Sequence, residues 1–178
     1  MSETGAELVE ETQAESDEDV IQYLTFCLTT NVVGVPLKSV KEVMGVKPIT
    51  LLPRTPKFMR GVINLRGQIV PVIDLKLKFG MGSTEFTVDS CIIIIEVSIN
   101  EQPILIGALA DSVKDVVESH SNNMDPAPKM GAAMDSKFIL GMSKYENEFF
   151  TTLNIDVLFS IEELMEGAQT GIISASIN

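Results

Sequence analysis

The stretch Gly61-Val-Ile-Asn-Leu-Arg-Gly-Gln-Ile-Val-Pro-Val-Ile-Asp74 decides the fold. It contains two apolar runs typical of β-strands, separated by a turn around Leu65 to Gly67. Glycine at the turn can supply the positive φ that a tight hairpin requires. Pro71 has no N–H to donate, so we expect the second strand to lie at an edge or to be bulged there. The stretch therefore predicts a β-hairpin.

Short strands also dominate the sequence on both sides of this hairpin. Apolar runs between turn residues predict them at 21–29, 90–98, 103–110, 113–117, 138–143 and 149–153. Only short helices are expected, at 37–44, 75–79, 154–158 and 160–165. A long polar loop is expected over 119–136. Many short strands with little helix favour barrels or a sandwich over a doubly wound sheet, with a seam near residues 80–90.

Charge is concentrated at the N-terminus and argues against nucleic acid as a partner. The net charge is −12, and residues 1–19 carry eight acids and no Lys or Arg. Because few large apolar groups there could offset the entropy of ordering, we expect 1–19 to be a disordered acidic tail. The 13 basic residues are scattered along the chain, whereas a phosphate-binding surface requires clustered Lys and Arg.

The sequence predicts a cytoplasmic protein. Its longest unbroken apolar run, Cys91 to Ile95, is far shorter than the roughly 20 residues of a membrane-spanning helix. The N-terminus lacks the basic residues and apolar stretch of a secretory signal. Cys27 and Cys91 have neither CxxC nor Cys/His spacing, which favours reduced core thiols over a disulfide or a zinc site.

Candidate catalytic residues do not assemble into a site. The only histidine, His120, has no His or Cys neighbour and is expected to be a solvated loop residue. The stretch Gly80-Met-Gly-Ser-Thr84 lacks both the third glycine of a dinucleotide fingerprint and the Gly-Lys-Ser/Thr of a P-loop. Asp111 and Asp115 are isolated carboxylates in an extended region. We therefore expect no enzymatic activity, no cofactor and no metal.

One combination favours a binding role instead. The predicted helix 37–44 carries Glu42, and the hairpin turn presents Arg66 between Leu65 and Gly67. If the Arg66 guanidinium is half-buried, it requires a carboxylate or carbonyl partner. The simpler alternative is a surface hairpin arginine.

Extended back to Phe58, the hairpin resembles the signature of the CheW domain, in which an apolar-x-Gly-x-x-Asn-x-Arg-Gly hairpin leads into Ile/Val-Pro-x-x-Asp. The resemblance covers roughly residues 21–166. It implies a mainly β fold of two intimately packed SH3-like five-stranded β-barrels with short helices and a C-terminal helix. The implied boundaries are a CheW-like domain at 20–166, sub-barrels at about 20–85 and 86–153, a closing helix at 154–166 and a flexible tail at 167–178.

The resemblance also implies a function. CheW proteins are non-enzymatic adaptors that bridge the cytoplasmic tip of chemoreceptors and the regulatory domain of the histidine kinase CheA. By position, Val40, Glu42 and Arg66 match the receptor-binding region, with Glu42 as the expected partner of Arg66. Arg60 and Gly61 match the kinase-binding region. The protein is then expected at receptor arrays on the inner face of the membrane.

Alternatives stay open at this point. An adaptor of this family could serve a non-chemotactic pathway such as surface motility or gene regulation. A small-molecule or metal-dependent enzyme would require a deep polar pocket with converging titratable groups. CheA and CheV also contain the domain, but 178 residues leave no room for their kinase or receiver domains, so we expect a stand-alone adaptor.

Overall fold

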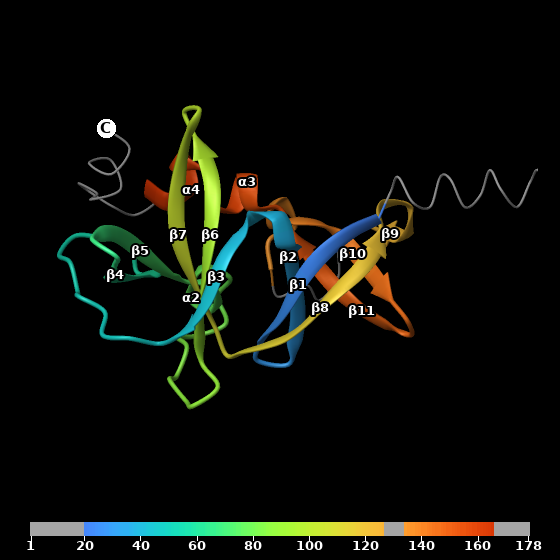
Figure 1. Cartoon of the computed structure of the whole chain (residues 1–178), viewed down its shortest axis with the longest axis horizontal. Coiled ribbons are helices and arrows are strands. Elements are labelled where there is room, and N and C mark those ends of the chain that lie inside the picture. Colours follow the sequence, from blue (N-terminus) through green and yellow to red (C-terminus); the bar gives the residue numbers. More distant parts are fainter. Residues whose placement is uncertain (1–19, 127–133, 166–178) are drawn as a thin grey trace, which may run out of the picture.

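The computed structural model describes residues 20–126 and 134–165. It confirms a mainly β protein, built from two sheets that lie side by side with a few short helices (Figure 1). The predicted tails at 1–19 and 167–178, and most of the Pro-rich part of the predicted loop, lie outside the described residues. In the described part of the chain, no helix is both long and apolar enough to cross a bilayer.

The first sheet, here the hairpin sheet, contains the hairpin that the sequence predicted. Its strands run in the order β3-β6-β7-β5-β4 and are antiparallel neighbours except for the parallel pair β5 and β7. The turn between β4 and β5 places Leu65 opposite Gln68, which confirms the predicted turn. The strand bounds are β3 Val40–Gly45, β4 Met59–Leu65, β5 Gln68–Asp74, β6 Cys91–Ile99 and β7 Gln102–Ala110.

The hairpin sheet curves until its two edges meet. Just after β3, Thr50 forms an isolated antiparallel bridge with Val62 of β4, the strand at the opposite edge. The Thr50 N–H donates to the Val62 carbonyl at 2.8 Å, and the Val62 N–H donates back to the Thr50 carbonyl at 2.9 Å. Pairing the two edges in this way leaves fewer unpaired backbone groups. This closure is consistent with the expected SH3-like barrel.

The second sheet, here the terminal sheet, combines strands from both ends of the described chain. Its order is β8-β1-β2-β11-β10-β9, with a short parallel pairing between β2 and β11. The Ser119 hydroxyl on β8 donates to the Lys144 carbonyl on β10 at 2.9 Å, so this sheet also curves toward closure. The strand bounds are β1 Val20–Leu28, β2 Asn31–Pro36, β8 Ser112–His120, β9 Met124–Asp125, β10 Ile139–Tyr145 and β11 Glu148–Leu153.

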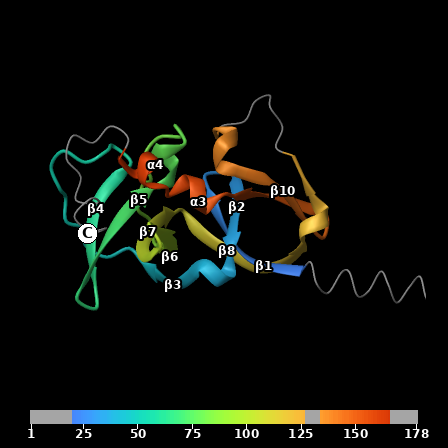
Figure 2. The same ribbon diagram turned by 90° about the horizontal axis from the view of Figure 1, so that it is seen from above.

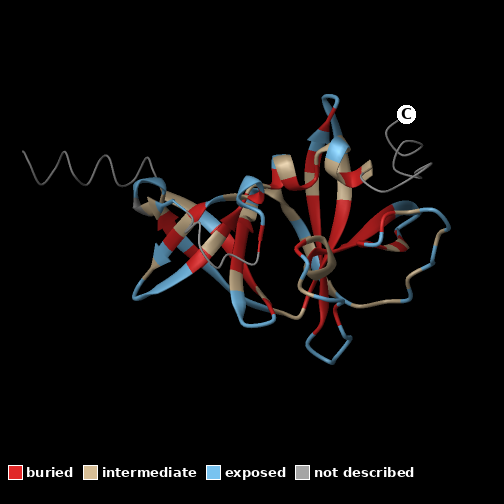
Figure 3. Ribbon diagram, turned by 180° about the vertical axis from the view of Figure 1, so that it is seen from behind, coloured by how far each residue is buried: buried red, intermediate tan, exposed pale blue. Residues whose placement is uncertain are grey.

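One hydrophobic core joins the two sheets. Phe26 and Val35 of the terminal sheet and Ile93 and Ala108 of the hairpin sheet belong to the same cluster, and all four are fully buried. Figure 3 shows this buried interior running through both sheets, with exposed residues at the turns. The intimate packing implied by the resemblance is therefore present, because the largest buried cluster takes residues from both sheets, although the hairpin sheet also has a smaller cluster of its own.

Short helices cover one side of the junction between the sheets (Figure 2). The Asp74 side chain caps α2 by accepting from the backbone N–H groups of Lys76 and Leu77. At the C-terminal end, the Ser160 hydroxyl accepts from the Glu163 N–H at 3.4 Å, which confirms the predicted opening of the last helix. The helix bounds are η1 Leu37–Ser39, α2 Leu75–Lys78, η2 Ser121–Asn123, η3 Ser136–Phe138, α3 Ile155–Leu158 and α4 Ile161–Met165.

The predicted helix at 37–44 is wrong. Only Leu37–Ser39 is helical, as a single 3-10 turn, and the chain then enters β3. Exposure alternates along β3, with Val40 and Met44 half-buried and Val43 exposed. The apolar residues fit helical spacing and strand alternation alike, and pairing with the isoleucine-rich β6 decides for the strand.

Three further expectations need correction. The predicted halves at 20–85 and 86–153 do not correspond to the sheets, since β1 and β2 join the late strands and β6 and β7 join the early ones. Strand β5 is not an edge strand, because β7 pairs with it from Val72 onward. Pro71 lies just before that pairing begins, so its missing N–H removes no bond to β7. The predicted loop at 119–136 is shorter, because β8 continues to His120 and β9 follows at Met124.

A shared core predicts that the two sheets unfold together. Phe26→Ala should lower the free energy of unfolding by about 3–5 kcal/mol, because it removes a fully buried ring. Phe149→Ala is the matched control, since Phe149 is 52% exposed. Denaturant unfolding followed by circular dichroism should show one transition for both variants. Two separate transitions in the wild-type protein would contradict a common core.

Candidate functional site

The β4–β5 turn presents Arg66 to solvent beside Glu42. Arg66 and Gly67 have φ values of 51° and 86°, the two positive φ values of a type I′ turn. The Asn64 side chain stabilises the turn by accepting from the Gly67 N–H at 2.8 Å. The Arg66 guanidinium is ion-paired with the Glu42 carboxylate on β3. The structure thus brings together the two residues that the resemblance paired.

This ion pair lies at the surface. The Arg66 side chain is 74% exposed and that of Glu42 is 31% exposed, so the half-buried guanidinium considered from the sequence is not what the structure shows. An exposed pair of this kind contributes about 0–1 kcal/mol to stability. The position of the pair matters more than its stability. The pair links β3 to the β4–β5 turn at the opposite edge of the sheet, and both charged groups remain accessible to a partner.

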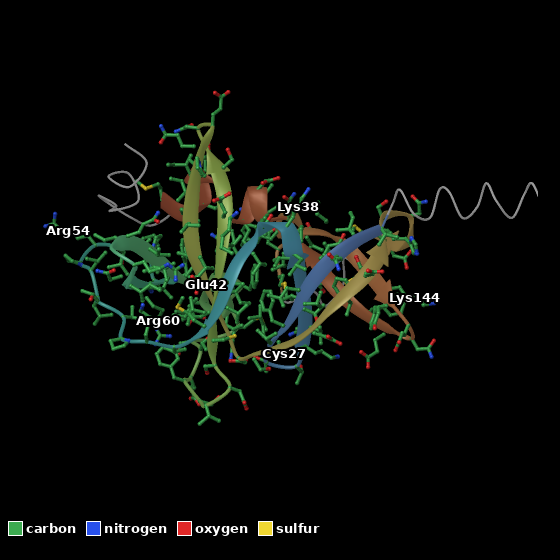
Figure 4. The ribbon with its side chains drawn as sticks, in the orientation of Figure 1. Cys27, Lys38, Glu42, Arg54, Arg60 and Lys144 are labelled. Carbon is green, nitrogen blue, oxygen red and sulfur yellow. The ribbon has the colours of Figure 1, made fainter. Side chains whose placement is uncertain are left out.

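Val40 lies two residues before Glu42 on β3, with the exposed Lys41 between them. It is half-buried and packs against the shared core. Just before it, a mostly apolar concavity of about 580 Å³ lies between the start of β1 and the η1 turn, lined by Val20, Ile21, Gln22, Pro36, Leu37 and Lys38. Figure 4 shows Lys38 and Glu42 on the stretch that crosses from one sheet to the other. An apolar concavity and an exposed ion pair are therefore neighbours along this crossover.

Arg60, at the start of β4, is held by a buried carboxylate. Its Nη1 donates to Asp74 Oδ2 at 2.9 Å and to the Thr84 carbonyl at 3.2 Å. Its side chain is 28% exposed, and its guanidinium carbon lies 4.9 Å from the centroid of the Phe86 ring. The positive charge of Arg60 is thus largely compensated within the protein by the Asp74 carboxylate. The exposed part of the Arg60 side chain lies beside the Phe86 ring.

Asp74 is the centre of this arrangement and is fully buried. Besides Arg60, it accepts from the Thr84 N–H at 2.9 Å and from the Thr84 hydroxyl at 2.8 Å, and it caps α2. A buried carboxylate is tolerated only when it is paired and hydrogen-bonded in this way. Although Asp74 ends the signature hairpin, sequence reasoning assigned it no role, because its partner Thr84 is ten residues away.

Gly61 is required by the closure of the hairpin sheet. Its φ is 143°, and a Cβ built there would lie 2.2 Å from the Thr50 carbonyl oxygen. A side chain would therefore push away the segment that pairs with β4 at Val62. The structure gives Gly61 a role in packing, and any effect of its replacement on a partner would pass through this backbone contact.

A second concavity, of about 640 Å³, lies beside α4 and contains buried charge. Lys78 Nζ pairs with Glu163 Oε2 at 3.0 Å and lies 4.2 Å from the centroid of the Phe58 ring, with its side chain only 3% exposed. Lys137 Nζ pairs with the other Glu163 oxygen at 2.7 Å. Burial tends to raise the pKa of the Glu163 carboxyl, but the hydrogen bonds from Lys137 and Lys78 outweigh it and leave the pKa below its ordinary value. Glu163 thus fastens α4 to α2 through Lys78 and to η3 through Lys137.

The remaining chemical candidates stay apart. His120 ends β8 and lines a shallow polar concavity with Glu118 and Asp125. Cys27 and Cys91 are free thiols, and burial, aided by the Asp111 carboxylate, raises the pKa of the Cys91 thiol. Within residues 20–126 and 134–165, no group of three His, Cys, Asp or Glu side chains could hold a metal ion.

Two curved sheets that share their largest buried cluster, with an exposed ion pair near an apolar concavity, define a small β-module. Residues 22–163 match the family model described as CheW-like domain, and the chain therefore belongs to that family. The sequence-based recognition is confirmed.

Relatives and a solved structure agree with this assignment. The chain is 29% identical to the chemotaxis protein CheW of Klebsiella aerogenes over 80% of this chain and 84% of the relative. It is 31% identical to the probable chemotaxis protein CheW of Rhizobium etli over 72% of this chain and 81% of the relative. It also resembles the crystal structure of the scaffolding protein TtCheW from Thermoanaerobacter tengcongensis, with a TM-score of 0.69 and 34% identity over 80% of this chain and 90% of that one.

The close contact at Gly61 predicts a strong response to a single methyl group. Gly61→Ala should destabilise the protein by about 2–4 kcal/mol, because the added Cβ meets a backbone oxygen at a strained φ. Gly45→Ala is the control, since no atom lies within 4 Å of a Cβ at that exposed position. Thermal melts would contradict the closure if both variants melted like the wild type.

The lowered pKa of Glu163 predicts a contribution to stability that depends on pH. Because the folded-state pKa lies below the unfolded value of about 4.3, the contribution is complete above that value and is lost as pH falls through the folded-state pKa. Urea unfolding of Glu163→Gln should therefore show a shallower loss of stability on acidification than the wild type. Glu162→Gln, at an exposed neighbouring position, should keep the wild-type slope. Equal slopes for the wild type and Glu163→Gln would contradict this role.

Proposed function

We propose that this protein is a non-enzymatic adaptor that couples chemoreceptors to the histidine kinase CheA in bacterial chemotaxis. The observation that carries the proposal is the match of residues 22–163 to the CheW-like domain, on a chain whose relatives are named as chemotaxis proteins. A similar solved structure is titled a scaffolding protein. The adaptor acts at receptor arrays on the inner face of the membrane.

The receptor tip binds the crossover region that carries Val40, Glu42 and Arg66. Support comes from the exposed ion pair, whose carboxylate and guanidinium can exchange partners with charged groups of a receptor. The apolar concavity beside Leu37 provides a place for the apolar face of a helical receptor hairpin. Together they give a receptor surface with an apolar centre and a charged rim.

The kinase regulatory domain binds near Arg60 and Gly61, at the other end of β4. Arg60 and Arg66 are six residues apart on an extended strand, which separates them by about 20 Å. This distance favours simultaneous binding of receptor and kinase by one molecule. Arg60 contributes mainly by holding its surroundings in place, since its guanidinium is engaged by Asp74.

Reconstitution tests the proposal. Mixed with receptor cytoplasmic fragments and CheA from the same organism, the protein should co-sediment as a ternary complex and raise kinase autophosphorylation. Arg66→Ala should weaken receptor binding about fivefold or more while changing the free energy of unfolding by less than about 1 kcal/mol. Lys41→Ala is the control, because Lys41 lies next to Glu42 on β3 and its loss removes a different exposed ion pair, the one with Glu96 on β6. If the protein assembled with none of the receptors and kinases of its own organism, the adaptor role would be refuted.

A further inference from the structure

The loop from Thr84 to Ser90, here the 84–90 loop, presents two apolar side chains to solvent. Val88 is fully exposed and Phe86 is 48% exposed. In Figures 1 and 3 the loop that leads into β6 projects away from the body of the hairpin sheet, and Figure 3 colours most of it as exposed. An exposed apolar pair at the tip of a projecting loop loses contact with water only when a partner covers it.

Hydrogen bonds fix both ends of the 84–90 loop. At its start, Thr84 is tied to the buried Asp74 carboxylate through its N–H and its hydroxyl. At its end, the Ser90 hydroxyl accepts from the Thr87 N–H at 2.8 Å and donates to the Glu85 carbonyl at 3.3 Å, and the Ser90 N–H donates to the Thr87 carbonyl at 3.2 Å. The conformation is thus set before a partner arrives, which lowers the entropic cost of binding.

The 84–90 loop is joined to the proposed kinase region through Arg60. The guanidinium lies against the Phe86 ring and donates to the Thr84 carbonyl. Because Arg60 is already neutralised by Asp74, it offers a partner little free charge. The accessible groups at this end of β4 are instead the exposed Phe86 and Val88, with the exposed acids Glu85 and Asp89 beside them.

We propose that the 84–90 loop is the element that binds the kinase, with Phe86 and Val88 entering an apolar recess of the CheA regulatory domain whose rim carries Lys or Arg side chains. This inference rests on the proposed adaptor function and names the residues that perform it. The acids at 85 and 89 select the basic rim by charge complementarity, and the two apolar side chains supply the buried contact. Arg60 acts as a positioning residue that holds Phe86.

The test measures binding of the full-length protein to full-length CheA by calorimetry. Val88→Asp should weaken kinase binding about tenfold or more, because a charge then enters the apolar recess. Its melting temperature should stay at the wild-type value, since Val88 makes no buried contact. Val116→Asp is the matched control, at a valine that is 45% exposed on the terminal sheet. Affinity for the receptor fragment should be unchanged in Val88→Asp.

Two results would overturn the inference and are distinguishable. If the wild-type protein binds CheA and Val88→Asp binds equally well, the 84–90 loop is not the contact, and the adaptor function stands without it. If the wild-type protein does not bind CheA, the proposed function itself fails. The variant Glu85→Lys tests the basic rim: weaker binding supports it, and unchanged binding at low salt contradicts it.

Discussion

The buried Asp74 carboxylate is the interaction on which this end of the hairpin sheet depends. It receives the Arg60 guanidinium, two groups of Thr84 and the N-terminus of α2, so one side chain fixes the end of a strand, a helix and a loop. In the described residues, no buried side-chain nitrogen or oxygen lacks a hydrogen-bond partner. A carboxylate with this many donors is stable in the interior, and removal of any of them would leave charge poorly compensated.

The same hairpin carries the two proposed surfaces at opposite ends. One end holds the Glu42 and Arg66 ion pair near an apolar concavity, and the other holds Arg60 beneath Phe86. The strand between them is held by the Thr50 bridge, for which Gly61 leaves room. A rigid strand between two contact regions sets their distance and orientation, which is a property required of a scaffold.

The sequence was sufficient for the elements whose signals are local. The β4–β5 turn follows from Gly67, the β6–β7 hairpin from the polar turn after the isoleucine run, and α4 from Ser160 with Glu163. Strand β3 was predicted as a helix, and β2 was not predicted, because strand pairing depends on partners far along the chain. The Arg66 pair came from family resemblance, whereas the Asp74 and Glu163 networks required coordinates, since nothing local links Glu163 to Lys78.

The interleaved order of the strands has a consequence for how the chain folds. Residues 40–110 contain every strand of the hairpin sheet, but β2 must wait for β11, which ends at Leu153, before the terminal sheet is complete. During synthesis, β1 and β2 are therefore made first and reach their last neighbour near the end. Contacts between segments so distant in sequence form slowly because a long loop must close first. Until β11 is made, the hairpin of β1 and β2 keeps an unpaired strand edge, and unpaired edges favour aggregation.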